Sequence, residues 1–141
     1  MSAENKALVR RWFEEVWNQG NTAAIYEMFP SGRKSYGFPD PDGFVGVEEF
    51  VETHKNFTSA FSDIHVTIDD LIAEDDRVAV RLTCTMKHTG EGMGVSPTGQ
   101  AVTLKGATII SVEDGMIAES WNYFDIPGLV SKLQSYAAAK A

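Results

Sequence analysis

The architecture of this chain follows from residues 78–88, which read Val78-Ala79-Val80-Arg81-Leu82-Thr83-Cys84-Thr85-Met86-Lys87-His88. Apolar side chains alternate here with polar or small ones along the whole stretch. Because successive side chains of a strand point to opposite faces, this period of two predicts a long strand with one buried face. The same alternation begins at Ile64 and returns in 102–112 and 116–124, with turn residues between these segments.

The residues before these strands have the period of a helix instead. Apolar residues in Asn5–Asn18 form one wide helical face, and further helices are expected over 22–29 and from Val47 to about residue 61. Residues 31–46 are rich in Gly and Pro and are expected to be loop, and Pro127 is expected to begin a C-terminal helix. Helices followed by strands predict a single α+β domain over residues 1–141. In it, N-terminal helices pack in a strongly curved antiparallel sheet, which forms a cone with an internal pocket.

Composition excludes several classes of function. The net charge of −8 disfavours a nucleic-acid or anionic-membrane partner, and no apolar run is long enough to cross a membrane. The single cysteine, Cys84, rules out an internal disulfide and a cysteine-based zinc cluster. We therefore expect a cytoplasmic protein that takes a small molecule.

Asp125 is the candidate catalytic residue. It follows the last strand, where the large rings of Trp121 and Tyr123 share one face with Glu119, and this face is assigned to the inside of the sheet. A carboxyl group at the end of that face is partly desolvated, which favours use as a general acid or base. The alternative is that Asp125 caps the helix that begins near Pro127, and spacing alone does not separate the two roles.

His88 is the second catalytic candidate, because its position on the buried face lets it reach the cavity mouth and hold a substrate oxygen. The alternative is an ordinary histidine of a surface hairpin. His54 lies in the apolar stripe of its helix, where it either reaches the cavity or forms a hydrogen bond within the core. Aromatic, histidine and thioether side chains are expected to bind the substrate, namely Trp12, Trp17, Phe50, His54, Phe57, Met86, Met93, Trp121 and Tyr123.

Several motifs together resemble the SnoaL-like polyketide cyclases, in the ester-cyclase branch of the fold shared by nuclear transport factor 2 and ketosteroid isomerase. They are residues 9–21 (Val9-Arg10-Arg11-Trp12-Phe13 onward), the helix start at 46–50, residues 72–81, His88-Thr89-Gly90-Glu91, Pro97-Thr98-Gly99, and residues 113–125 with Gly128-Leu129. The resemblance covers nearly the whole chain. Tyr36 stands where many relatives carry a histidine before the third helix, and it joins the expected substrate-binding set.

The resemblance implies a cofactor-independent lyase or isomerase of the aldol-cyclase kind that uses no metal. In the characterised cyclases, an aspartate late in the chain is the general acid and base, and Asp125 is the matching position. His88 is then expected to stabilise the oxygen on which negative charge gathers. The expected substrate is apolar and carries a carbonyl group.

Two other functions of the same fold stay open. One is a binding module without catalysis, and the other is an epoxide hydrolase, which needs a second carboxylate such as Glu119 near Asp125. A homodimer is expected to form through the outward sheet face, which is poor in charge. The residues assigned to that face are Thr83, Thr85, Ala107, Ile109, Asn122 and Phe124.

Overall fold

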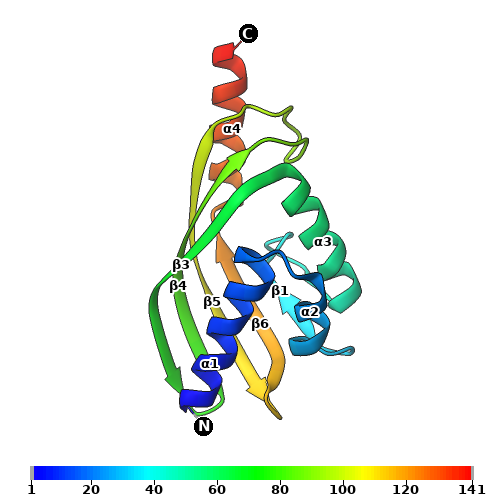
Figure 1. Cartoon of the computed structure of the whole chain (residues 1–141), viewed down its shortest axis with the longest axis vertical. Helices are drawn as coiled ribbons and strands as arrows, with labels where there is room; N and C mark the ends of the chain where they lie inside the picture. The colour runs from blue at the N-terminus through cyan, green and yellow to red at the C-terminus, as the bar shows by residue number, and fades with distance from the viewer. Residues whose placement is uncertain (1, 141) are drawn as a thin grey trace.

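Figure 1 shows a computed structural model of the chain, which describes residues 2–140. The first helix, α1 (Ser2–Trp12), continues directly into a π-helix, η1 (Phe13–Asn18). Two further helices follow, α2 (Thr22–Met28) and α3 (Val47–Ala60). The three helical segments predicted from apolar spacing are therefore confirmed, with a local change of helix type that spacing did not reveal.

Six strands form one sheet in the order β2-β1-β6-β5-β4-β3. Neighbouring strands are antiparallel except β1 and β6, which are parallel, so the sheet is mixed and not purely antiparallel. The α+β class is confirmed, while the strong curvature of the sheet stays a prediction. The strands are β1 (Lys34–Tyr36), β2 (Phe44–Val45), β3 (Phe61–Glu74), β4 (Arg77–His88), β5 (Ala101–Glu113) and β6 (Met116–Phe124).

Residues 31–46 are not all loop, because they contain β1 and β2. These strands have three and two residues. Such short segments carry no readable alternation, and β1 is held by pairing with β6, which lies more than 80 positions later in the chain, with Ser35 opposite Ser120. A contact this distant in sequence leaves no local signal in a segment rich in Gly and Pro.

The buried face predicted for residues 78–88 is confirmed. Val78, Val80, Leu82, Cys84, Met86 and His88 are all buried. Figure 1 shows α1, α2 and α3 on one side of the sheet, so this face packs against the helices. The expected turn after β5 is also confirmed, since Asp114 and Gly115 both have positive φ between Glu113 and Met116.

The prediction of which side chains of β6 face inward is wrong beyond Ile117. Ser111 pairs with Glu119, whereas the next residue of β5, Val112, pairs with Ile117, so Ala118 is an extra residue in β6. An extra residue of this kind is a β-bulge, and it reverses the facing of everything that follows. Ser120, Asn122 and Phe124 therefore face the helices.

The C-terminal helix α4 (Ile126–Lys140) begins at the end of β6. Its Leu129 and Leu133 are buried in the core. Figure 1 shows α4 at the end of the molecule opposite the start of α1, which is also the end where β4 connects to β5. No helix within residues 2–140 is long and apolar enough to cross a membrane.

Candidate functional site

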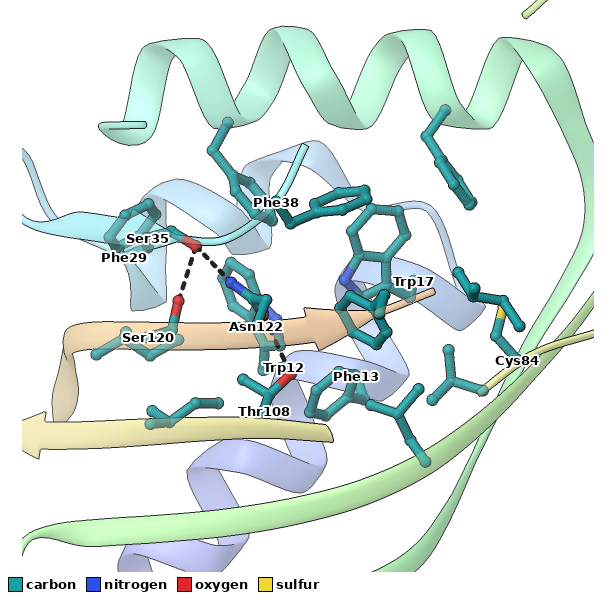
Figure 2. A pocket seen from close by; sticks show the side chains of 18 residues that line it. Trp12, Phe13, Trp17, Phe29, Ser35, Phe38, Cys84, Thr108, Ser120 and Asn122 are labelled. Carbon is teal, nitrogen blue, oxygen red and sulfur yellow. Dashed lines mark hydrogen bonds between the residues drawn. The ribbon is translucent and has the colours of Figure 1, made fainter. Parts of the chain in front are cut away.

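A pocket lies between the helices and the inner face of the sheet, and Figure 2 shows its lining side chains. The volume open to the centre of a water molecule is about 60 Å³. The apolar lining is Trp12, Phe13, Trp17, Phe29, Phe38, Phe50, Phe57, Val66, Leu82, Cys84, Leu104, Ile110, Ile117 and Phe124, and the polar lining is Ser35, Thr108, Ser120 and Asn122. An apolar cavity with a few polar groups is the usual form of a small-molecule site.

Of the residues expected to bind substrate, Trp12, Trp17, Phe50 and Phe57 line this pocket. Their rings contact one another, with Trp17 lying edge-on to Phe57 at 5.5 Å between centroids and Trp12 at 5.4 Å from Phe50. The other six expected residues do not line it, namely Tyr36, His54, Met86, Met93, Trp121 and Tyr123.

The π-helix explains why Trp12, Phe13 and Trp17 all reach the pocket. Gln19 donates its backbone N–H to the carbonyl oxygen of Glu14 at 2.9 Å, five residues back. This wider turn brings residues five apart, such as Trp12 and Trp17, onto one side of the helix. Single-turn π-helices often occur at functional sites, and this one places two indole rings in the cavity wall.

Tyr36, Trp121 and Tyr123 lie on the other face of the sheet, which corrects their assignment to the pocket. The bulge at Ala118 turns Trp121 and Tyr123 outward, and Tyr123 is 63% exposed. Tyr36 stacks on Trp121 there, with 5.9 Å between centroids. Glu119 shares this face, so the epoxide hydrolase alternative finds no carboxylate among the described residues that line the pocket.

Ser35, Thr108, Ser120 and Asn122 form a polar corner of the pocket that sequence reasoning missed. They come from three strands, β1, β5 and β6, and Figure 2 shows them joined by hydrogen bonds along one side of the cavity. Ser35 and Thr108 are each 2% exposed. The alternation of β6 placed Asn122 on the outer face, and only the bulge brings it inside.

His54 packs beside the pocket without lining it. Its ring lies 4.9 Å from that of Trp17, and its Nε2–H donates to the carbonyl oxygen of Val16 at 2.7 Å. Burial lowers the pKa of His54 below its usual value, and the bond to Val16 opposes this shift only in part. The other ring nitrogen, Nδ1, has no partner among residues 2–140. His54 is therefore a neutral core residue that ties α3 to the π-helix. Of the two interpretations from the sequence, the hydrogen bond within the core is the one that the structure shows.

His88 is also fully buried and lies outside the pocket lining. Its Nδ1 accepts the backbone N–H of Thr98 at 3.3 Å, so the proton of the neutral ring is on Nε2. Its ring packs 5.3 Å from Phe61. The structure places His88 in the base of the hairpin and not at a cavity mouth.

Asp125 is exposed and caps α4. Its side-chain Oδ1 accepts the backbone N–H of Gly128 at 3.0 Å. Its backbone carbonyl oxygen accepts the backbone N–H of Leu129 at 3.1 Å. A Cβ at position 128 would lie 2.2 Å from Asp125 Oδ2, so Gly128 makes room for this cap. Asp125 follows Phe124, which lines the pocket, but it does not line the pocket itself.

Cys84 is the only titratable side chain among the described residues of the pocket lining, and burial raises the pKa of its thiol to about 11. It is therefore a neutral thiol at physiological pH and behaves as an apolar wall residue. Within residues 2–140, no group of three or more His, Cys, Asp and Glu side chains is arranged to hold a metal ion.

The pattern of the SnoaL-like polyketide cyclase family matches residues 7–133. The chain belongs to this family. Among solved structures, AclR from Streptomyces galilaeus, a proposed hydroxylase, is 30% identical, with 96% of this chain and 83% of that chain covered and a TM-score of 0.85. A proposed polyketide cyclase from Acidithiobacillus ferrooxidans is 25% identical over 97% and 99% of the two chains, with a TM-score of 0.81.

A proposed SnoaL-like cyclase from Jannaschia sp. CCS1 has a TM-score of 0.86 at 24% identity, covering 96% of this chain and 94% of its own. This likeness concerns the fold. The comparison with curated proteins found no match.

Proposed function

We propose that this SnoaL-like protein binds a flat, apolar small molecule that carries a neutral carbonyl group. The observation that carries the proposal is the aromatic pocket with its single polar corner at Ser35, Thr108, Ser120 and Asn122. Rings favour flat apolar surfaces, while a few buried polar groups fix the orientation of a ligand. No Lys or Arg of the described chain lines the pocket, so a carboxylate or phosphate has no cationic partner there.

The size of the pocket limits the ligand. A water molecule needs about 10–15 Å³ by the measure that gives about 60 Å³ here, so the cavity has room for roughly four to six waters. At about 30 Å³ of liquid per water, this corresponds to a bicyclic molecule of roughly ten heavy atoms. A larger ring system requires the aromatic side chains to move apart.

Tryptophan fluorescence tests this binding. The chain has three tryptophans, and the variant Trp121→Phe keeps only the two of the pocket wall, Trp12 and Trp17. Titration of this variant with indanone, a flat bicyclic ketone, is expected to change its emission in a saturable way. A change that grows linearly, as with free tryptophan, contradicts the proposal.

An intramolecular aldol ring closure is the reaction we propose for a bound dicarbonyl compound. The base removes a proton from a carbon next to one carbonyl, the enolate carbon attacks the other carbonyl carbon of the same molecule to close the ring, and the resulting alkoxide takes up a proton. Family membership supports this reaction, and so does the position of Asp125 directly after a pocket residue. Asp125 must leave its cap on Gly128 to act as the base.

Binding without catalysis is the second candidate, and the pocket lining itself favours it. Among the described residues that line the cavity, none is an Asp, Glu or His. Asp125→Asn separates the two candidates, because asparagine caps a helix as well as aspartate does but cannot act as a base. Turnover of a model dicarbonyl by the wild type that this variant abolishes, with indanone affinity unchanged, supports the cyclase. No turnover by either protein supports the binder.

We also propose a homodimer formed through the outer row, defined here as the side chains directly opposite one another across all six strands. They are Phe44, Tyr36, Trp121, Ile109, Ala79 and Ile72. Phe44 is 57% exposed and Ile72 66% exposed, which is unusual for large apolar residues in one row. Asn122 and Phe124 do not belong to this face, contrary to the prediction. Light scattering that gives a monomer at micromolar concentration contradicts the dimer.

A further inference from the structure

The hydrogen bonds of the polar corner centre on the hydroxyl group of Ser35. Its Oγ accepts the hydroxyl proton of Ser120 at 2.8 Å and an amide N–H of Asn122 at 3.0 Å. Ser35 is 2% exposed and Ser120 8% exposed, and both line the pocket. Figure 2 shows the three side chains meeting at the Ser35 oxygen.

Asn122 has no N–H donor free for a ligand, since one N–H donates to Ser35. Its second N–H donates to the carbonyl oxygen of Tyr36 at 2.8 Å, and its Oδ1 accepts the hydroxyl proton of Thr108 at 3.1 Å. Because a carbonyl oxygen only accepts, the bond to Tyr36 fixes which end of the amide is nitrogen. The side chain that most resembles a ligand-binding amide is therefore occupied within the protein.

The serine pair, by contrast, has one hydroxyl proton that is not used in a hydrogen bond within the protein. Ser35 and Ser120 have two hydroxyl protons between them, and the bond that joins them uses one. The other has no acceptor among the hydrogen bonds of the described residues. Buried hydroxyl groups normally satisfy their donors, so a cavity wall with a spare O–H is complementary to an acceptor.

We propose that the Ser35–Ser120 pair donates this proton to the carbonyl oxygen of the bound ligand and so selects ketones over hydrocarbons of the same shape. The inference rests on the proposed binding function and adds the group that recognises the oxygen. Either serine can be the donor, because reversing the bond between them moves the spare proton from one oxygen to the other.

This exchange predicts an unusual mutational pattern. Each single variant, Ser35→Ala or Ser120→Ala, still has one hydroxyl proton to offer, so each keeps most of the preference. The double variant has none. Asn122 keeps its bonds to Tyr36 and Thr108 in the double variant, and its remaining N–H is directed at the space that the Ser35 hydroxyl leaves.

The experiment compares the affinities of indanone and indane, which share a bicyclic skeleton and differ by the carbonyl oxygen. The wild type is expected to bind indanone about fivefold more tightly, as one net hydrogen bond gives. The double variant is expected to lose most of this preference. Ser111→Ala is the matched control, since Ser111 is also buried on the sheet but bonds to the backbone N–H of Glu119 and does not line the pocket.

The outcomes separate this inference from the proposed function. If the wild type binds both probes equally, the pocket binds apolar molecules but the serine pair selects nothing, and the inference is wrong. A preference that is undiminished in the double variant also overturns it. If neither probe binds, the proposed function fails first and this inference with it.

Discussion

The two faces of β6 are reversed from the assignment that residue size predicts, in which the large rings face the inside of the sheet. The outer face holds the large rings of Trp121 and Tyr123, whereas the pocket face holds the small polar Ser120 and Asn122. Of these two rings, Trp121 is partly covered by neighbours on the sheet, since Tyr36 stacks on it and Arg77 lies 5.2 Å above it. Trp121 and Tyr123 therefore mark a surface, whereas Ser120 and Asn122 mark the site.

This contrast has one cause, the extra residue Ala118. Without a bulge, Ile117 and Trp121 share a face, and with it Ile117 shares the inner face with Ser120. A bulge next to a site re-aims the side chains that follow it. Ser120 and Asn122 belong to the polar corner of the pocket because of this one inserted position.

The largest expected difference between the two faces is in stability. Ile117→Ala removes a side chain that is 2% exposed and is expected to lower the free energy of unfolding by about 2–5 kcal/mol. Tyr123→Ala, at 63% exposure, is expected to cost less than about 1 kcal/mol. Urea unfolding at submicromolar protein, where a dimer contributes least, measures both. Equal losses contradict the assignment of faces.

A smaller effect is expected where β6 ends at Asp125. Asp125→Ala removes the cap on Gly128 and is expected to lower the free energy of unfolding by about 1 kcal/mol, whereas Asp125→Asn is expected to leave it nearly unchanged. Thermal unfolding of the three proteins under one condition provides the comparison. If alanine at this position has no effect on stability, the capping role is wrong.

A further effect concerns His54 and pH. Its pKa is lowered in the folded protein, so the unfolded chain takes up a proton first as the pH falls through the usual histidine range. Stability is therefore expected to fall with decreasing pH below about 6.5, by at most about 1.4 kcal/mol per pH unit from this group.

His54→Gln is the control for this prediction, because the glutamine amide can still donate to Val16 but does not titrate. Urea unfolding between pH 7.5 and 5.5 is expected to give a shallower loss for the variant than for the wild type. Parallel curves show that His54 is not the group responsible.

Much of the fold was predictable because its signals are local. The alternation in 78–88 and the apolar face of Asn5–Asn18 predicted a strand and a helix that the structure confirms. The aromatic half of the pocket followed from the same helix faces, since Trp12, Trp17, Phe50 and Phe57 line it.

The polar half was not predictable, for two physical reasons. The bulge at Ala118 is decided by pairing with β5, and the position of Ser35 by pairing with a strand more than 80 residues away. The sequence around Ala118 or Ser35 does not indicate which strand pairs with it. His88 shows the same limit, because alternation predicted its burial correctly but not that Thr98 would occupy its Nδ1.

The most direct test of this account is a crystal structure of the protein with indanone. We expect the bicyclic ring between Trp12, Trp17 and Phe57, with its oxygen within hydrogen-bonding distance of Ser35 or Ser120. A ketone found instead against Asp125 or on the outer row, with the cavity between helices and sheet empty of ligand, would contradict it.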